Sequence, residues 1–144
     1  MRFFFYGTLQ AGSANPVAAA IHGKLVSEGP AALSGSLFAI PDATGWFPAL
    51  VEGPGTVHGQ VYGAGPDFTS DDLAAMDRYE DFDPARPAQS LYLRIVMPLA
   101  DGTAVQVYRF NQPLPSGSRP IPQGAFKAWL AAAGVAEFSG RHDA

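Results

Sequence analysis

Tyr6-Gly7-Thr8-Leu9 is the first segment whose residue types and position suit chemistry. It follows an aromatic run, so it leaves a buried strand as a loop. Free backbone N–H groups of such a loop suit a carboxylate or a developing oxyanion. Gly7 lets the chain turn and lets a ligand approach the backbone closely. From spacing alone, an ordinary strand end with a turn glycine is the simpler interpretation.

Glu80 is the candidate general acid or base. It ends a segment in which Leu73, Met76 and Asp77 recur at helical spacing, so it lies near the face that carries core contacts. A carboxylate at an inward-leaning helix end is desolvated, which raises its pKa and makes it a better base near neutral pH. From spacing alone, a solvated glutamate without a role is the safer interpretation.

Tyr92, Arg94 and Tyr108 form a third candidate group. Tyr92 and Arg94 are two residues apart on one predicted strand and therefore share a face, and Tyr108 lies on the hairpin partner. If that face lines a cavity, Arg94 can hold a carboxylate through two parallel hydrogen bonds. An equally favoured alternative is an arginine whose side chain extends over the sheet beside aromatic neighbours.

Other kinds of site are disfavoured. The chain has no cysteine, which excludes disulfides, thiolate nucleophiles and cysteine-bound zinc. His22, His58 and His142 lack metal-ligand spacing, and no dinucleotide, P-loop or serine-elbow motif is present, so we expect no metal and no cofactor. The net charge of −4, with nine scattered Lys and Arg residues, argues against nucleic-acid binding.

The length of 144 residues fits a single domain over 1–144, with a loose tail from about 139. No apolar run approaches the ~20 residues that span a bilayer, so we expect no membrane association. The N-terminus has a short apolar run and no small-residue cleavage site, which predicts a first strand and a cytoplasmic protein.

Short strands separated by turns dominate the predicted elements, which favours an α+β fold: a small mixed or antiparallel sheet, curled towards a β-barrel, with flanking helices. Thr69 and Asp72 have capping-box spacing, and Asp101-Gly102 predicts a hairpin. Turns are expected at Pro41-Asp42 and at Gly53-Pro54-Gly55. Extended segments are predicted over 2–6, 24–28, 35–40, 57–62, 91–99 and 104–110, and helices over 16–21, 69–79 and 124–133.

Seven short segments, in this order, resemble the γ-glutamylcyclotransferase-like (AIG2-like) family and cover nearly the whole chain. They are the strand and loop Phe3-Phe4-Phe5-Tyr6-Gly7-Thr8-Leu9, Phe47-Pro48-Ala49-Leu50, Val57-His58-Gly59-Gln60-Val61-Tyr62, the helix end 73–80 (LAAMDRYE), Tyr92-x-Arg94, the strand 104–108, and Ile121-Pro122-Gln123-Gly124 before a last helix.

The resemblance implies a mixed fold built on a small β-barrel. It also implies that the Tyr6–Leu9 loop binds substrate and that Glu80 is the catalytic acid/base. Members of this family act on γ-glutamyl amines, γ-glutamyl amino acids or γ-glutamyl-lysine isopeptides, release the amine and form 5-oxoproline. The expected partner is therefore a small γ-glutamyl substrate.

Three departures from the family pattern concern the expected pocket and its helix. Asp81 stands where the family commonly has glycine, and the loop between Glu80 and Tyr92 is long and holds two prolines. Met76 replaces the more usual leucine, which is a mild change of packing. The loop borders the expected pocket, so these departures bear on substrate specificity.

The reaction that the resemblance implies needs no enzyme nucleophile, because the substrate's α-amine attacks its own γ-carbonyl. One carboxylate serves both proton transfers. Two alternatives stay open: a catalytically silent module that binds a γ-glutamyl-like or carboxylate metabolite, and an interaction domain that uses the Pro-rich segment 110–123. The sequence leaves the amine and the oligomeric state undetermined.

Overall fold

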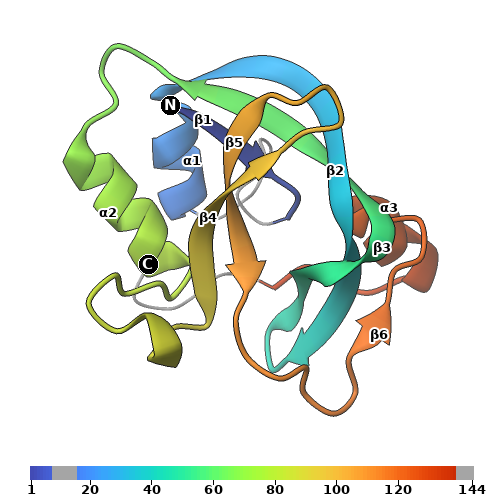
Figure 1. Ribbon diagram of the computed structural model, residues 1–144. Helices are drawn as coiled ribbons and strands as arrows, with labels where there is room; N and C mark the ends of the chain where they lie inside the picture. Colours follow the sequence, from blue (N-terminus) through green and yellow to red (C-terminus); the bar gives the residue numbers. More distant parts are fainter. Residues whose placement is uncertain (8–15, 139–144) are drawn as a thin grey trace.

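The computed structural model describes residues 1–7 and 16–138 of the chain (Figure 1). The predicted tail from about 139 lies outside these residues. Within them, no helix is both long and apolar enough to cross a membrane. The elements in chain order are β1 (Arg2–Phe5), α1 (Pro16–His22), β2 (Leu25–Asp42), β3 (Gly45–Ala64), α2 (Ser70–Tyr79), the 3₁₀ helix η1 (Pro87–Gln89), β4 (Tyr92–Pro98), β5 (Ala104–Phe110), β6 (Arg119–Pro120) and α3 (Phe126–Ala133).

The six strands form one sheet in the order β4-β5-β1-β3-β2-β6. β1 pairs in parallel with β5 through Phe3 and Gln106, whereas the other neighbours pair antiparallel. The sheet curls into a half-barrel, with α1 and α2 at one side and α3 behind β2 and β3 (Figure 1). The predicted α+β fold with a mixed, curled sheet is confirmed.

β1 divides the core because its side chains alternate between the two faces of the sheet. Phe3 and Phe5 pack in one apolar cluster with residues of α1 and α2, including Met76 and Tyr79. Phe4 and Tyr6 belong to a second cluster, which α3 closes with Phe126 and Leu130. The chain therefore leaves β1 between the two clusters, with Tyr6 buried.

The predictions for β2 and β3 are partly wrong. The extended pieces 24–28 and 35–40 belong to one long strand. This strand ends at Asp42, but Pro41-Asp42 is not the turn, because these residues still pair with Trp46 and Gly45 and the turn follows at residues 43 and 44. Gly53-Pro54-Gly55 is not a turn between strands but lies within β3, where the pairing register shifts.

Close contact between the two strands explains this bulge. A Cβ on Gly53 would lie 2.0 Å from the Ser36 hydroxyl oxygen, and a Cβ on Gly55 would lie 2.8 Å from the Gly35 carbonyl oxygen. The glycines therefore allow the two strands to approach closely while their backbone pairing continues on both sides. A glycine pair that usually indicates a turn forms a β-bulge here.

The helix signals are largely confirmed. Thr69 and Asp72 form the predicted capping box: the Thr69 N–H donates to Asp72 Oδ2 (2.8 Å) and the Asp72 N–H donates to Thr69 Oγ1 (3.3 Å). α3 begins at Phe126 rather than at Gly124. Gly124 has a left-handed φ of 67° and its carbonyl accepts the His58 N–H (2.8 Å), so it docks against β3 before the helix begins. The hairpin at Asp101-Gly102 joins β4 and β5 as predicted.

Candidate active site

Tyr6 fixes the point at which the chain leaves β1. Its buried hydroxyl donates to the Tyr108 carbonyl oxygen on β5 and accepts the Leu50 N–H of β3 (3.4 Å). Burial and, after it, the nearby negative charge of Glu80 hold the pKa of the Tyr6 hydroxyl well above its ordinary value. Tyr6 is therefore a neutral phenol at physiological pH, tied to the strands on either side of β1.

Gly7 lies buried against Pro48 of β3. A Cβ at this position would lie 2.3 Å from Pro48 Cγ and 3.1 Å from Pro48 Cδ. The close approach that requires glycine is therefore made by the proline ring. Thr8 and Leu9, the other two residues of the predicted binding loop, lie outside the described residues.

Glu80 caps the C-terminus of α2 and is half-buried. Its N–H donates to the carbonyl oxygens of Met76 (3.1 Å) and Asp77 (3.2 Å). Asp81 follows with a left-handed φ of 52°, and the Phe82 N–H returns to the Asp77 carbonyl oxygen (2.8 Å). This is the hydrogen-bond pattern of a Schellman motif, which ends the helix and fixes the backbone of Glu80.

Tyr108 joins this group from β5. Burial, the Asp77 carboxylate and Glu80 together raise the pKa of its hydroxyl well above the ordinary value. The charge of Glu80 thus acts on two buried phenols, one at the end of β1 and one on β5. The structure brings Tyr6, Glu80 and Tyr108 together, although they are far apart in the sequence.

Arg94 uses its guanidinium within the protein. Nε donates to Asp77 Oδ1 (2.9 Å), Nη2 approaches Asp77 Oδ2 (3.4 Å), and Nη1 donates to Gln106 Oε1 (2.8 Å). The Tyr108 hydroxyl donates to the same Asp77 Oδ1 (2.6 Å). Although partial burial acts in the opposite direction, Asp77 raises the pKa of Arg94, which therefore stays charged.

Tyr92 supports the site from behind. Its buried hydroxyl donates to the Pro48 carbonyl oxygen, and its ring meets Phe110 edge to face, with 5.4 Å between centroids. Since Pro48 also packs on Gly7, Tyr92 supports Gly7 through this proline.

Sequence reasoning gave no role to four residues that hold this arrangement: Pro48, Leu50, Asp77 and Gln106. Asp77 carried a usable signal, because it lies three residues before Glu80 on the inward face of the same helix. Pro48 and Leu50 stand in a segment that resembles the family, yet nothing in their spacing indicates that they contact Gly7 and Tyr6.

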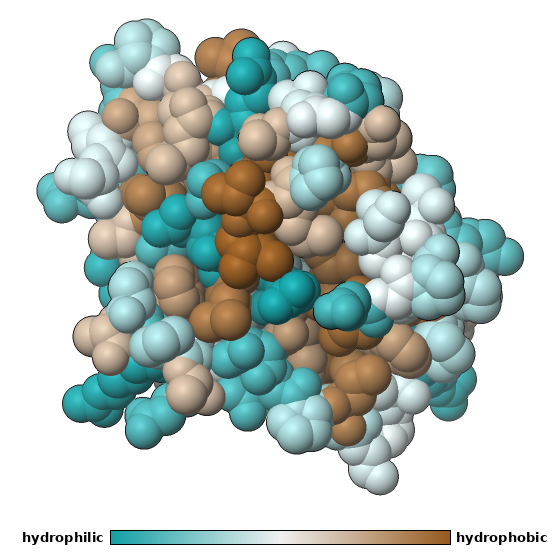
Figure 2. Space-filling view, viewed as in Figure 1, coloured by the Kyte–Doolittle hydropathy of each residue, from teal (hydrophilic) through white to brown (hydrophobic). Residues whose placement is uncertain are grey.

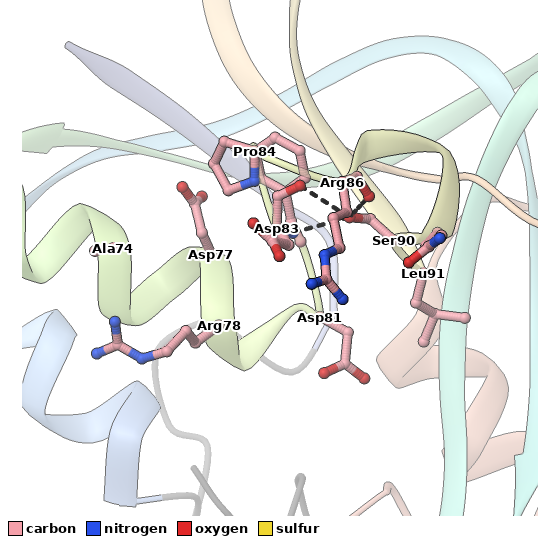
Figure 3. A pocket seen from close by; sticks show the side chains of 11 residues that line it. Ala74, Asp77, Arg78, Asp81, Asp83, Pro84, Arg86, Ser90 and Leu91 are labelled. Atoms are coloured by element: carbon pink, nitrogen blue, oxygen red, sulfur yellow. Dashed lines mark hydrogen bonds between the residues drawn. The ribbon is translucent and has the colours of Figure 1, made fainter.

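A hollow of about 770 Å³ lies where α2 meets the loop 81–91. Its lining includes Asp77, Asp81, Phe82 and Arg86, so it is bordered by charges of both signs (Figure 3). Ser90 ties this loop together, because its Oγ accepts the Asp83 N–H (2.8 Å) and donates to the Arg86 carbonyl oxygen (3.0 Å).

Beside this hollow, apolar side chains lie exposed along the middle of the same face of the molecule, over the β4–β5 hairpin (Figure 2). Val96 of β4 is 62% exposed. In the part of the chain that the structure describes, no three or more His, Cys, Asp or Glu side chains gather as metal ligands.

Comparisons with known proteins agree with this architecture. Residues 3–128 match the sequence model of the family described as "Gamma-glutamyl cyclotransferase, AIG2-like". No curated protein matches the chain.

Solved structures with the same fold share little sequence. An uncharacterized protein from Pyrococcus horikoshii is 14% identical, with a TM-score of 0.65 over 93% of this chain and 96% of that one. An AIG2-like protein from Mus musculus is 22% identical, with a TM-score of 0.57 over 79% of each chain. Kluyveromyces lactis allophanate hydrolase is 16% identical with a TM-score of 0.68, and the match covers 92% of this chain but 21% of that protein.

Proposed function

The chain belongs to the γ-glutamyl cyclotransferase, AIG2-like family, and on that premise we propose that it releases an amine from a γ-glutamyl amine or γ-glutamyl amino acid. The glutamyl part leaves as 5-oxoproline. In this reaction the α-amine nitrogen of the substrate bonds to its own γ-carbonyl carbon, and the bond from that carbon to the leaving nitrogen breaks.

Glu80 is the proposed proton shuttle. The α-ammonium must lose a proton before it can attack, and the leaving nitrogen must gain one before it can depart. A single carboxylate performs both transfers in turn, and general acid–base catalysis of this kind contributes about 10²- to 10⁴-fold.

The observation that carries the proposal is the place of Glu80 beside the end of β1. Glu80 is half-buried at the C-cap of α2, and its charge acts on the hydroxyls of Tyr6 and Tyr108, which supports a role for its carboxylate beside them. Both hydroxyl protons are already donated, to the Tyr108 carbonyl and to Asp77. Neither phenol competes with Glu80 as the acid, which supports the assignment of proton transfer to the carboxylate.

The loop that begins at Tyr6 and Gly7 and continues to Thr8 and Leu9 is the proposed binding segment. Its backbone N–H groups would stabilise the tetrahedral oxyanion. A pocket that folds the flexible glutamyl chain so that amine and carbonyl meet contributes about 7–11 kcal/mol in favourable cases. We assign Tyr92 and Tyr108 to the support of such a pocket, because their hydroxyls donate to the Pro48 carbonyl and to Asp77.

The test is Glu80→Gln, which keeps the shape of the side chain and removes the proton shuttle. We expect 5-oxoproline release from γ-glutamyl amines to fall about 10²- to 10⁴-fold, with an unchanged circular dichroism spectrum. Glu52→Gln, at an exposed position in the β3 bulge, is the matched control and should keep wild-type turnover.

Wild-type turnover by Glu80→Gln would refute the assignment of Glu80. A wild-type protein that binds γ-glutamyl amines without releasing 5-oxoproline would instead be the silent binding module.

A further inference from the structure

We propose that Arg94 and Asp77 are positioning residues that clamp the end of α2, and with it Glu80, against the sheet. We call Asp77, Phe82 and Arg94 the Arg94 clamp. The inference rests on the proposed role of Glu80, and it gives Arg94 a task other than binding a substrate carboxylate.

The first half of the clamp joins side chains. The side chain of Asp77 is 7% exposed and that of Arg94 is 19% exposed, and their closest atoms lie 2.9 Å apart. The same carboxylate accepts the Tyr108 hydroxyl, so α2 is tied to both β4 and β5 at one residue. Removing one member of a buried ion pair leaves the other charge without compensation, so the pair resists separation.

The second half of the clamp joins Asp77 to Glu80 through the backbone. The Asp77 carbonyl oxygen accepts the N–H groups of Glu80 (3.2 Å) and Phe82 (2.8 Å). The guanidinium carbon of Arg94 also lies 6.0 Å from the centre of the Phe82 ring, within reach of a cation–π contact. Arg94 therefore contacts Asp77, which precedes Glu80 in the chain, and Phe82, which follows it.

The contacts of Arg94 with Asp77 and Phe82 fix the backbone on both sides of Glu80 relative to the sheet. A catalytic carboxylate must keep its distance from the reacting nitrogen, and a displacement of about 1 Å costs about 10²-fold in rate. Tyr6 and Tyr108, which lie near the carboxylate, are held by the same sheet. The clamp thus keeps the proton shuttle aligned with the other residues of the site.

The two possible roles of Arg94 predict different kinetics. A residue that holds the substrate carboxylate lowers KM, so its loss raises KM. A positioning residue acts on the chemical step, so its loss lowers kcat and leaves KM nearly unchanged. All three guanidinium nitrogens already donate to Asp77 or Gln106, which favours the positioning role.

The experiment is a double-mutant cycle of Arg94→Gln and Asp77→Asn on 5-oxoproline release. Each variant should lower kcat about 10- to 100-fold with KM within about threefold of wild type, and the double variant should be no worse than the poorer single one. Arg94→Lys, which keeps the charge, should recover part of the loss.

Lys24→Met is the control, because Lys24 pairs with Asp72 (3.0 Å) at the opposite end of α2. It should leave kcat unchanged. A tenfold rise in KM with an unchanged kcat in Arg94→Gln would overturn the clamp.

Amide hydrogen exchange tests the clamp without any substrate. In Asp77→Asn, the amides of Glu80 and Phe82 should exchange at least about tenfold faster, while the Leu73 amide, bonded to Thr69 at the start of α2, keeps its rate. If Asp77→Asn does not fold, Arg94→Gln provides the same comparison. A wild-type protein without turnover would end the proposed function, whereas unchanged exchange at Glu80 and Phe82 would end the clamp.

Discussion

At Gly7 the candidate site requires the absence of a side chain. The Pro48 ring occupies the space that a Cβ would need, with 2.3 Å to Cγ. Pro48 is itself held by the Tyr92 hydroxyl at its carbonyl oxygen, so it cannot withdraw without breaking a buried hydrogen bond. We therefore expect Gly7→Ala to shift the start of the proposed binding loop and to destabilise the fold by about 1–3 kcal/mol, as overpacking does elsewhere.

Urea unfolding measures this change, and the same variant should lose 5-oxoproline release. Gly23→Ala is the control, because a Cβ there would meet only the Ala20 carbonyl oxygen at 3.4 Å. Equal stability of the two variants would show that Pro48 moves aside easily.

The sequence predicted the position of the candidate residues better than their contacts. Tyr92 and Arg94 were expected to share a face, and each uses its polar atoms on the protein, at Pro48 and at Asp77. These partners come from β3 and α2. A spacing of two residues along one strand predicts that their side chains share a face of the sheet, but it does not indicate which element covers that face.

At the scale of elements, the C-terminus of α2 holds Glu80 through a motif that usually ends in glycine. Asp81 occupies the left-handed position with φ 52°, and the Phe82 N–H closes the motif on Asp77. A left-handed conformation costs an ordinary residue about 1–2 kcal/mol, whereas glycine adopts it freely. The Schellman motif therefore forms here although Asp81 disfavours the left-handed conformation that the motif requires.

Two substitutions at this position isolate the backbone effect. Asp81→Gly and Asp81→Ala both remove the carboxylate, so their difference reports the left-handed conformation alone. We expect the glycine variant to be more stable than the alanine variant by about 1 kcal/mol in urea unfolding. Equal stabilities would mean that the chain can end α2 without the left-handed residue.

Local signals explain which elements could be predicted. The capping box at Thr69 and the hairpin at Asp101-Gly102 depend on residues within a few positions of each other, and both are present. Gly53 and Gly55 form a bulge instead of the predicted turn, because their effect depends on Ser36 and Gly35 of the partner strand. A turn and a bulge use the same residue types, so only the pairing of the strands distinguishes them.

At the scale of the whole molecule, the site exists because the sheet order brings distant segments together. β1 lies between β3 and β5, which places Tyr6 beside Leu50 and Tyr108, and α2 packs on the same core. β1 pairs with β3 and β5, and β2 pairs with β6, although these strands are not consecutive in sequence, so periodicity could not supply the order. The resemblance of seven segments implied a mixed fold built on a small β-barrel, and the order of the strands comes from the structure.

Tyr6 and Tyr108, two of the buried phenols of the site, predict how the whole protein responds to alkali. In the folded state the pKa values of Tyr6 and Tyr108 lie well above 10, whereas in the unfolded chain they are ordinary. Their contribution to stability is therefore complete below about pH 10 and is lost as the pH rises from there towards the folded-state pKa values. Each phenol lowers the free energy of unfolding by about 1.4 kcal/mol per pH unit in this range, so the pair predicts a fall of about 2.7 kcal/mol per unit.

Urea unfolding at closely spaced pH values between 8 and 11 measures the slope, and tyrosinate absorbance shows whether ionisation accompanies unfolding. Tyr6→Phe removes one of the two groups and should reduce the slope by about 1.4 kcal/mol per pH unit, even though the variant is less stable at every pH. A slope that is unchanged in Tyr6→Phe would mean that this hydroxyl ionises within the folded protein. That result would contradict the burial of the Tyr6 hydroxyl between β3 and β5.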